Sequence, residues 1–475
     1  MVWVSGLVAA LTLLLLLLAF YLLTTKIKAR KSSHINLPPG SLGWPLVGET
    51  LKLLRAQRDG KPEDFVEERM AKHDSRVFKT SLLGDPMAVL CGPMGNKFLF
   101  GNETKLVAQW WPTSVRRLFG PCLINLVGDE AKRVRKMLMT FLNPDALVRY
   151  ITTMDAVTKH HITTHWQGKE EVKVYPTIKL YTFELACRLF MSIEDPEHIS
   201  KLAALFNVFL KGVIGIPLNF PGTRFYSAMR AASAIRKELQ GIARQKRVAL
   251  EHKAVSPSQD LLSHLLATAD ENGRFMSEEE IINNLLTLLF AGHDTSSSVI
   301  TMLMKYLEEL PQVYEKVLAE QMDIASSKGA GETAAMGRHT EDELCESHHP
   351  YPVAFREALV DFTYAGCTIP KGWKLYWSAA ATHKDPNLFP SKEKFDPSRF
   401  EGDGQPPFSY VPFGGGPRMC LGKEFARLEI LVFLHNVVKG FKWDLLIPDE
   451  KIEYDPMPTP VRGLPIRLQP RQSKA

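Results

Sequence analysis

The sequence has few cysteines, little excess charge and only one long hydrophobic run. Its six cysteines are spread over 475 residues without a Cys-x-x-Cys pair, so neither a zinc ribbon nor a disulfide framework is indicated. A net charge of +6 is too small at this length to indicate a nucleic-acid-binding protein. With 45% hydrophobic and 23% charged residues, the composition excludes wholesale disorder. These absences leave a globular protein of one large domain or two to three typical ones.

The hydrophobic run lies at the N-terminus. Residues 2–23 contain no charged side chain, and a helix of this length crosses a hydrocarbon core of about 30 Å. Four basic residues follow between positions 26 and 31. Because positive charge resists translocation, we expect them in the cytosol and the N-terminus in the lumen. A cleaved signal peptide is the alternative, but it requires a basic residue before the run and a small-residue cleavage site after it, and neither is present.

The chain is therefore expected to have three segments. These are an uncleaved transmembrane anchor at residues 2–23, a basic and proline-rich linker at residues 24–44, and a cytosolic body at residues 45–475. Within the linker, Pro38 and Pro39 fix a backbone angle and the following glycine permits a sharp turn. This composition predicts a stiff hinge between the anchor and the body.

The body has the pattern of a mainly α protein with minor β sheets. Helical periodicity is clearest over residues 129–142, 146–165, 178–211, 226–252 and 277–310. Short strand-like runs predict small sheets at Val77–Leu82, Met87–Cys91 and Lys374–Ser378. The segment 386–422 is rich in Pro, Gly and Phe and predicts a long irregular loop, followed by a helix over 423–439. A loop of this length inside a compact body is expected to be functional.

One cysteine lies in an unusual local sequence, FGGGPRMCLG, from Phe413 to Gly422. Three glycines permit torsions that are closed to other residues, and Pro417 blocks a helix there. The next helix is predicted to start almost at Cys420, so a thiolate there would meet backbone N–H groups and the positive helix end. Such a cysteine suits haem iron, and Arg418 can bond a haem propionate. A buried free cysteine is the alternative for Cys420 alone, but the pattern F-x-x-G-x-R-x-C-x-G matches five positions at fixed spacing.

This loop resembles the haem-thiolate signature of cytochrome P450 monooxygenases. The wider text PFGGGPRMCLGKEFARLEILVFLHNVV is similar to the plant branch that oxidises pentacyclic triterpenes, the β-amyrin 28-oxidase type. The similarity runs from Leu37 to the C-terminus, apart from the interrupted stretch described below. The resemblance implies the cytochrome P450 fold, haem b as cofactor, Cys420 as the axial iron ligand, and Phe413, Arg418 and Gly422 in the haem-binding loop.

The same resemblance implies the partners and the compartment. An enzyme of this type uses O2, acts on a hydrophobic terpenoid and sits in the endoplasmic reticulum membrane with its catalytic body in the cytosol. Its electrons come from NADPH through a separate NADPH–cytochrome P450 reductase, because this chain has no flavin or nicotinamide domain of its own.

A polar interruption, AGHDTSSS from Ala291 to Ser298, lies inside the apolar helix predicted around it. Polar residues inside an apolar helix need partners or a purpose. By the resemblance, this is the family's A-G-x-D-T groove, in which Ala291 and Gly292 make room for dioxygen and Asp294 and Thr295 relay protons. A helix with an exposed Ser/Thr-rich face is the alternative.

Two further arginines are candidates for binding the haem propionates. Arg135 matches the family's C-helix arginine, but Ala131 occupies the place where family members often have Trp or His. Arg356, in the text AFREAL, resembles the arginine that follows the K helix. Solvated surface arginines are the alternative for both. Trp110 and Trp111 lie where the family's B–C loop closes over substrate, and they could equally belong to the core.

The resemblance fails over residues 330–354. Family members have a K helix with E-x-x-R before AFREAL, and its ion pairs with an arginine matching Arg399 support the haem loop. Here the stretch has little apolar periodicity, and the literal E-x-x-R at Glu424–Arg427 follows the cysteine and belongs to the next helix. We hypothesise a local reading-frame shift or gene-model error. Sequencing the transcript tests this hypothesis, because an in-frame message matching the chain would contradict it.

Two alternatives to a triterpene oxidase stay open at this point. The missing E-x-x-R favours a catalytically impaired or non-enzymatic family member, since breaking a buried ion-pair network costs about 3–5 kcal/mol. A related enzyme that acts on diterpenes or sterols differs only in its substrate.

Overall fold

The computed structural model describes residues 35–45, 47–326, 353–392, 394–400, 405–455 and 457–471, together with Thr12. The predicted anchor at 2–23 apart from Thr12, most of the linker and the aberrant stretch up to residue 352 therefore lie outside the described residues. None of the helices in the described part of the chain combines the length and the apolar character that a membrane crossing needs.

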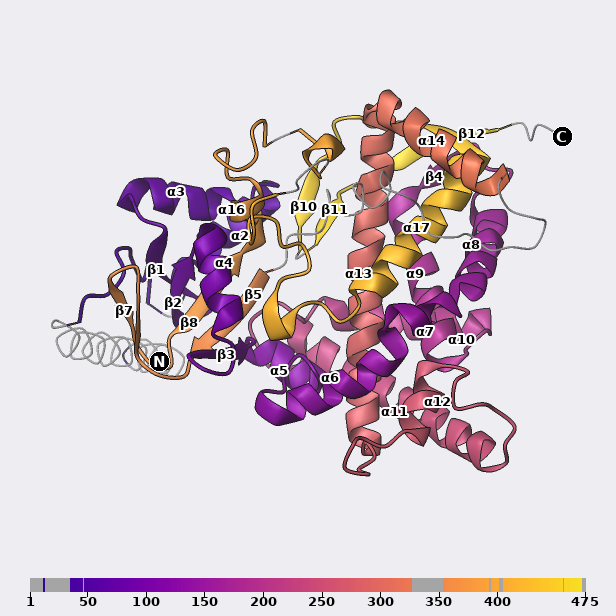
Figure 1. Ribbon diagram of the computed structural model, residues 1–475, viewed down its shortest axis with the longest axis horizontal. Coiled ribbons are helices and arrows are strands. Elements are labelled where there is room, and N and C mark those ends of the chain that lie inside the picture. Colours follow the sequence, from indigo (N-terminus) through magenta and orange to yellow (C-terminus); the bar gives the residue numbers. More distant parts are fainter. Residues whose placement is uncertain are drawn as a thin grey trace, which may run out of the picture.

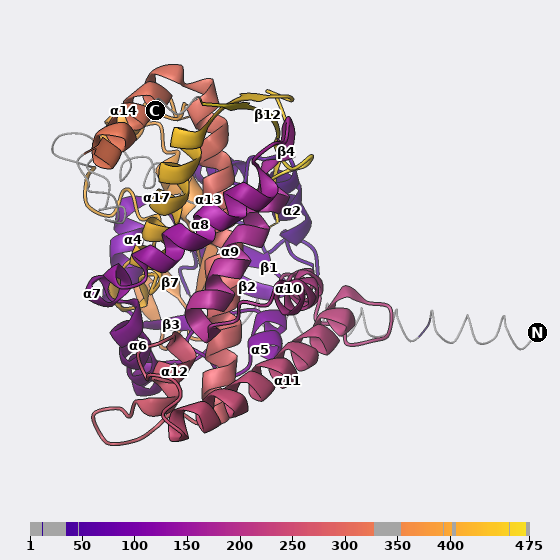
Figure 2. The same ribbon diagram turned by 90° about the vertical axis from the view of Figure 1, so that its right-hand side faces the viewer.

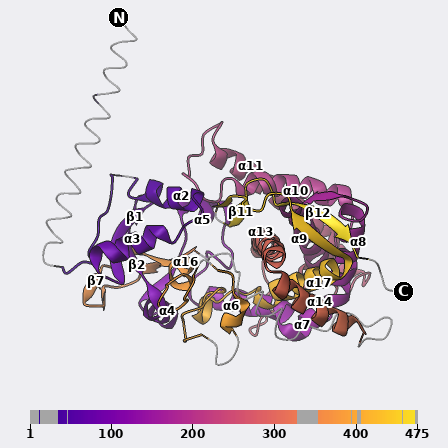
Figure 3. The same ribbon diagram turned by 90° about the horizontal axis from the view of Figure 1, so that it is seen from above.

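A 32-residue helix, α13 (Glu278–Glu309), runs through the middle of the molecule (Figure 1). Its start is fixed by a capping box: the Ser277 hydroxyl accepts the Glu280 N–H at 3.2 Å, and the Glu280 carboxylate accepts the Ser277 N–H at 2.7 Å. Seen end-on in Figure 3, α13 is surrounded by α9 (Val174–Met191), α17 (Lys423–Gly440) and α14 (Pro311–Ser326). Most of its side chains are consequently buried, which explains its largely apolar sequence.

The remaining helices cover this central bundle or lie beside the largest sheet (Figures 1 and 2). Those of the helical side are α5 (Thr113–Phe119), α6 (Gly128–Leu142), α7 (Pro144–Val148), α8 (Ile151–His165), α10 (Pro196–Leu210), α11 (Arg224–Glu251) and α12 (Leu261–Ala267). Those near the sheet are α2 (Thr50–Arg58), α3 (Asp64–His73), α4 (Gly92–Gly101) and α16 (Ala379–His383), and two 3₁₀ turns are η1 (Pro397–Phe400) and η2 (Gly416–Arg418).

The largest sheet has five strands in the order β1-β2-β8-β5-β3 and lies to one side of the helices (Figure 1). Its strands are β1 (Val77–Leu82), β2 (Asp85–Leu90), β3 (Val107–Trp110), β5 (Val353–Ala358) and β8 (Lys374–Ser378). β2 and β8 run parallel, while the other pairs are antiparallel, and β3 pairs with β5 so that Gln109 lies opposite Arg356. This register places a predicted propionate ligand, Arg356, on β5, next to the edge strand β3.

Three smaller sheets complete the fold. β12 (Pro465–Pro470) is the middle strand between β4 (Glu171–Lys173) and β9 (Phe441–Leu445). The two-stranded sheets pair β10 (Ile452–Tyr454) with β11 (Pro458–Pro460), and β6 (Phe362–Tyr364) with β7 (Cys367–Ile369). The predicted fold class, mainly α with minor β sheets, is confirmed by this arrangement.

The stretch of helical periodicity predicted over 178–211 is helical but contains two helices. The chain forms α9 and α10 there, separated by Ser192 in the left-handed region (φ 57°). A new helix then starts at Pro196, with the Asp195 side chain accepting two backbone N–H groups as its N-cap. The predicted helix over 146–165 is likewise divided between α7 and α8. Both helices at each break bury apolar residues, so the apolar periodicity continues across the break. The helix ends therefore cannot be located from the periodicity.

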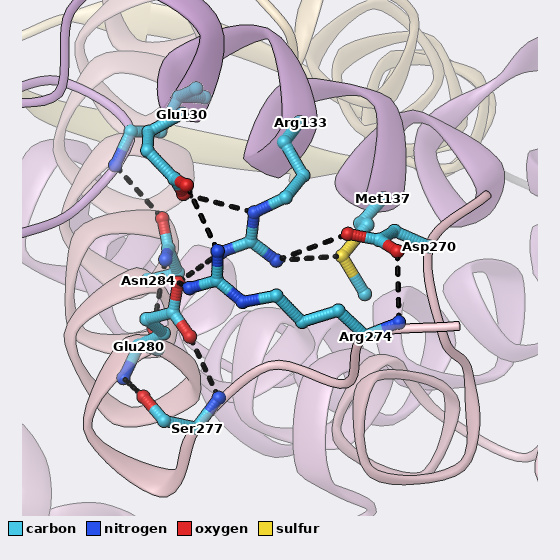
Figure 4. A network of polar contacts seen from close by, with 9 residues as sticks. Glu130, Arg133, Met137, Asp270, Arg274, Ser277, Glu280 and Asn284 are labelled. Atoms are coloured by element: carbon cyan, nitrogen blue, oxygen red, sulfur yellow. Dashed lines mark hydrogen bonds and ion pairs between the residues drawn. The ribbon is translucent and has the colours of Figure 1, made fainter. Parts of the chain in front are cut away.

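A charged network fixes α6 against the start of α13 (Figure 4). Arg133 donates to Glu130 at 2.9 Å and also bonds Glu280 on α13. Arg274, from the loop before α13, donates to Glu130 at 2.9 Å, and Asp270 lies 3.8 Å from Arg133. Several charges that share partners hold geometry better than an isolated surface pair. The network thus holds α6 in a defined position beside the site described next.

Candidate active site

A cavity of about 340 Å³ lies between α13, α17, β5 and the loop that carries the predicted cysteine. Its described lining is mainly apolar and includes Phe100, Trp111, Leu123, Ile124, Leu142, Phe190, Leu288, Val299, Ala354, Trp377, Leu421, Phe425, Ile430 and Met457. The same lining contains three arginines and, among the described residues, no aspartate or glutamate. An apolar cavity with a few convergent polar groups is the usual form of a ligand site.

The cysteine loop packs tightly against α4. Gly416 adopts φ +64°, and a Cβ placed on it would lie 2.6 Å from the Phe100 carbonyl oxygen. A Cβ on Gly415 would lie 2.4 Å from the Phe100 ring. The Cys420 N–H then donates to the Phe413 carbonyl at 2.8 Å and closes the turn. The glycines are therefore required by the close approach to Phe100, which holds the loop at a fixed depth below the cavity.

Cys420 lines the cavity, with its side chain open to it. Desolvation of the Cys420 thiol raises its pKa, while the hydrogen bond from the Gly422 N–H and the charge of Arg135 lower it. Metal ligation requires the thiolate, so a bound cation would supply the charge that this environment only partly provides. The helix α17 (Lys423–Gly440) begins three residues after Cys420, after the 3₁₀ turn η2 and Gly422. The helix predicted over 423–439, with its start almost at Cys420, is confirmed.

The three predicted propionate ligands converge on this cavity from three different elements. Arg135 on α6, Arg356 on β5 and Arg418 in η2 all line it. Arg135 donates to the Met419 carbonyl at 2.7 Å, and Arg418 donates to the Leu126 carbonyl at 2.8 Å. The structure thus brings together residues that lie far apart in the sequence.

The predicted oxygen groove forms one wall of the cavity. Ala291, Gly292, Thr295 and Ser296 of α13 line it, and the Thr295 hydroxyl donates to the Ala291 carbonyl at 2.6 Å. A Cβ on Gly292 would meet only the Phe425 ring, at 3.6 Å. The small side chains at Ala291 and Gly292 therefore leave space in this wall, and the Thr295 and Ser296 hydroxyls are polar groups on the same wall.

Asp294 lies on another side of α13 and is not part of the described lining. Its carboxylate pairs with Lys179 of α9 at 2.9 Å, and both side chains are largely buried. Burial alone would lower the pKa of Lys179, but Asp294 and Tyr175 outweigh it and raise that pKa. The sequence indicated neither Lys179 nor this ion pair, because the partners come from helices separated by over a hundred residues.

The two candidate tryptophans have different environments. Trp111 lines the cavity, as does Gln109, whereas Trp110 is buried in β3 with its ring edge-on to Phe355 at 5.7 Å. Trp110 is therefore a core residue, and only Trp111 can touch a ligand in the cavity. Sequence reasoning also missed Glu103, a buried carboxylate that pairs with both Arg356 and Arg418.

Comparison with known proteins identifies the family. The family model "Cytochrome P450" matches residues 38–465, which is most of the chain.

The chain belongs to the cytochrome P450 family.

Two curated plant relatives are similar over nearly their whole length. "Beta-amyrin 28-monooxygenase" of Vitis vinifera is 53% identical over 92% of this chain and 93% of its own length. "Beta-amyrin 6-beta-monooxygenase" of Solanum lycopersicum is 46% identical over 92% of this chain and 94% of its own. The solved structure of the retinoic acid-bound cyanobacterial CYP120A1 is 33% identical with a TM-score of 0.81, covering 92% of this chain and all of that one.

Membership of the cytochrome P450 family establishes haem b as the cofactor, and the residues present fit that group. Three buried or half-buried guanidinium groups line the cavity, and Glu103 is the carboxylate that pairs with two of them, Arg356 and Arg418. Buried positive charge needs a counter-charge, and haem b brings two propionates. The Cys420 thiol in the lining can serve as the iron ligand, and the small side chains of Ala291 and Gly292 leave space in the cavity wall. Cytochromes P450 also use O2 and a redox partner.

A buried carboxyl group behind the cytochrome P450 cavity is predicted to make stability depend on pH. Glu429 of α17 is fully buried, and burial raises its pKa to about 8, with Ser296 lowering it slightly. Between pH 5 and pH 8 the folded chain keeps this proton while the unfolded chain releases it. The free energy of unfolding should therefore fall by about 1.4 kcal/mol per pH unit from this group alone.

Replacing Glu429 by glutamine removes that contribution. We expect the thermal midpoint of Glu429→Gln to exceed that of the wild type at pH 8 and the difference to shrink towards pH 5. The buried histidines 161, 293 and 383 have pKa values lowered to about 3 by burial and act in the opposite direction as pH falls. They are present in both proteins, so they cancel in the comparison. Parallel pH profiles for the two proteins would contradict the prediction.

Proposed function

We propose that this protein is a haem-thiolate monooxygenase that inserts one oxygen atom of O2 into a C–H bond of a pentacyclic triterpene of the β-amyrin type. The observation that carries the proposal is that Cys420 lines one apolar cavity together with Ala291, Gly292 and three arginines. The close similarity to plant relatives named for β-amyrin oxidation supports the choice of substrate.

The residues around the cavity divide the work of binding the cofactor. Cys420 is the metal ligand, with Phe413 and Gly422 shaping the loop that presents it. Arg135, Arg356 and Arg418 hold the propionates through charge-assisted hydrogen bonds. Haem b, when bound, supplies the redox chemistry that activates O2.

Thr295 and Asp294 are proposed to handle protons. The Thr295 hydroxyl lies in the cavity wall and donates to its own helix, so it can turn towards a ligand without moving the backbone. Asp294 is adjacent in the chain and faces Lys179 on the other side. In this proposal the Asp294–Lys179 ion pair is the source of protons for the threonine.

The apolar lining fits a hydrocarbon substrate better than a polar one. Trp111, Leu123, Ile124 and Leu288 surround the space with few polar groups to desolvate. The plant relatives reported above are named for β-amyrin oxidation, so the diterpene and sterol alternatives are not favoured. The relatives differ in the carbon they oxidise, since one is named for carbon 28 and another for carbon 6; carbon 28 is the position proposed here, on the higher identity.

Turnover with a defined substrate panel tests the proposal. The full chain is reconstituted with a plant NADPH–cytochrome P450 reductase and given β-amyrin, a diterpene and a sterol in parallel. We expect NADPH-dependent oxidation of β-amyrin at carbon 28, identified by mass spectrometry and NMR. Oxidation of the sterol or diterpene alone would contradict the assigned substrate.

The impaired-enzyme alternative needs a separate measurement. The reduced, carbon monoxide-treated protein should show the red-shifted absorption band of a thiolate-ligated haem. Arg399 donates to the carbonyl groups of Pro390 and Ser391 at 2.9 and 2.7 Å, so its side chain has partners within its own loop. Absence of the band in a folded protein would favour the impaired alternative.

We further propose a single-pass endoplasmic reticulum protein with a cytosolic catalytic body, which receives electrons from NADPH–cytochrome P450 reductase. The apolar residues 2–23 support an anchor. Ile216 is 81% exposed and Phe220 65% exposed in the loop between α10 and α11, and Figures 2 and 3 show this loop on the same side of the molecule as α2. Leu51 of α2 is also exposed. Apolar groups gathered on one side suit contact with a lipid surface.

Extraction from membranes tests this arrangement. The full chain should stay in the microsomal pellet after alkaline carbonate washing, and a chain without residues 2–23 should be released. Release of the full chain by carbonate would contradict the anchor.

A further inference from the structure

Glu103 lies between two of the arginines that line the cavity. It is 5% exposed and belongs to the turn that joins α4 to β3. One carboxylate oxygen accepts Nε–H of Arg356 at 2.6 Å, and the other accepts Nε–H of Arg418 at 3.3 Å. Glu103 is not part of the described cavity lining, so it stands behind the arginines rather than in contact with a ligand.

The position of Glu103 is fixed by its own turn. The second carboxylate oxygen also accepts the backbone N–H of Gln109 at 3.1 Å. Within the turn, Thr104 has φ +68° and donates its N–H to the Val107 carbonyl at 2.7 Å. Because Gln109 lies opposite Arg356 in the pairing of β3 with β5, the carboxylate and this arginine are held by neighbouring strands.

The hydrogen bonds to Glu103 use only one edge of each guanidinium group. Arg356 otherwise donates to the Phe355 carbonyl at 2.9 Å, and Arg418 donates to the Leu123 and Leu126 carbonyls at 3.4 and 2.8 Å. A guanidinium has five N–H donors, so both arginines keep donors that these bonds do not use. Glu103 therefore orients the groups and leaves donors for an anion in the cavity.

The local charges are consistent with such an anion. Arg135, Arg356 and Arg418 carry three positive charges at the cavity, and Glu103 supplies one negative charge among the described residues around them. The net charge of these four side chains is equal in magnitude and opposite in sign to that of two ionised carboxylates. Without Glu103, the arginine group would carry more positive charge than two propionates neutralise, and Arg356, only 7% exposed, would lose its carboxylate partner.

We propose that Glu103 is a positioning residue for the haem propionates: it orients Arg356 and Arg418 towards them and sets the arginine group to the charge that two propionates neutralise. This inference rests on the proposed haem site. Glu103 touches neither the cofactor nor the substrate in this scheme, and its effect is carried entirely by the two arginines.

Haem transfer measures this role directly. Full-length wild type, Glu103→Gln and Glu103→Asp are reconstituted either with haem b or with haem b dimethyl ester, whose propionates are uncharged esters. The rate of haem loss to excess apomyoglobin is then followed for each protein. With haem b we expect Glu103→Gln to lose haem at least about tenfold faster, a difference of about 1.4 kcal/mol, and Glu103→Asp to recover part of the loss.

The dimethyl ester separates positioning from general loosening of the fold. Because the ester offers no carboxylate to the arginines, the rates of wild type and Glu103→Gln should agree within about twofold, as a coupled pair in a double-mutant cycle requires. We also expect the haem midpoint potential of Glu103→Gln to become more positive, since one negative charge near the cofactor is removed. An equal penalty with both cofactors would overturn the proposal in favour of a structural role.

Glu49→Gln is the matched control. Glu49 is also a buried glutamate paired with an arginine, Arg69 at 2.9 Å, but neither residue lines the cavity. This variant should lower the thermal midpoint without changing haem transfer. Unchanged or slower haem loss from Glu103→Gln would overturn the Glu103 proposal without affecting the proposed monooxygenase activity. A wild type that holds haem but does not oxidise β-amyrin would contradict only the assigned substrate.

Discussion

Replacing Cys420 by serine is expected to abolish both the red-shifted carbon monoxide band and turnover of β-amyrin. The side chain lies on the cavity floor, and the loop that presents it is closed by the Cys420 N–H bond to Phe413 at 2.8 Å. Serine preserves this backbone geometry but replaces a soft sulfur ligand by an oxygen that stays protonated. We expect turnover to fall at least about a thousandfold, equivalent to about 4 kcal/mol of lost transition-state stabilisation.

Cys367→Ser provides the control for this experiment. Cys367 is half-buried in the hairpin of β6 and β7 and is not part of the cavity lining. Its replacement should leave the absorption spectrum and turnover as they are in the wild type. If Cys420→Ser retained the red-shifted band, the axial ligand would be another residue and the assigned site would be wrong.

Gly416→Ala is the substitution outside the ligand itself with the largest expected effect. Its backbone has φ +64°, and the added Cβ would lie 2.6 Å from the Phe100 carbonyl oxygen. The left-handed conformation costs an alanine about 1–2 kcal/mol, and forcing an extra carbon into a packed position costs typically about 1–3 kcal/mol more. Because the contact is with backbone, the cysteine loop must move, and we expect faster haem loss and a lower thermal midpoint.

Gly101→Ala tests the same neighbourhood without the clash. Gly101 ends α4 directly after Phe100, and a Cβ there meets nothing within 4 Å. This variant should keep its haem, and its midpoint should change little or rise slightly, since alanine is the better helix former. Equal haem loss from both variants would show that the approach of η2 to Phe100 does not determine the depth of the loop.

The elements with strong, uninterrupted patterns could be predicted from sequence. The helix expected over 277–310 is α13 (Glu278–Glu309), and the strands expected at Val77–Leu82 and Lys374–Ser378 have those bounds. The break at Ser192 could not be predicted, because a left-handed serine leaves no mark in the apolar pattern. Local propensity and periodicity determine where a helix can form, whereas caps and tertiary contacts determine where it stops.

The candidate site was predictable where its chemistry is local in sequence. Arg418 and Cys420 lie within one loop, so spacing alone placed them together. Glu103 and Arg356 are separated by 253 residues, and Lys179 pairs with Asp294 from another helix. Such partners are chosen by how helices and strands pack, which no local spacing records. They are also the residues that decide whether the predicted groups are oriented and charged for their task.

The C-terminal strand has a consequence for the gene. β12 is the middle strand of its sheet, and Arg471, just beyond it, donates to the Tyr314 hydroxyl at 2.9 Å. A premature stop codon near position 465 would remove barely a dozen residues, yet it would leave β4 and β9 without the strand that joins them. Such an allele should behave as a null through degradation of the product, although every residue of the haem pocket would still be encoded.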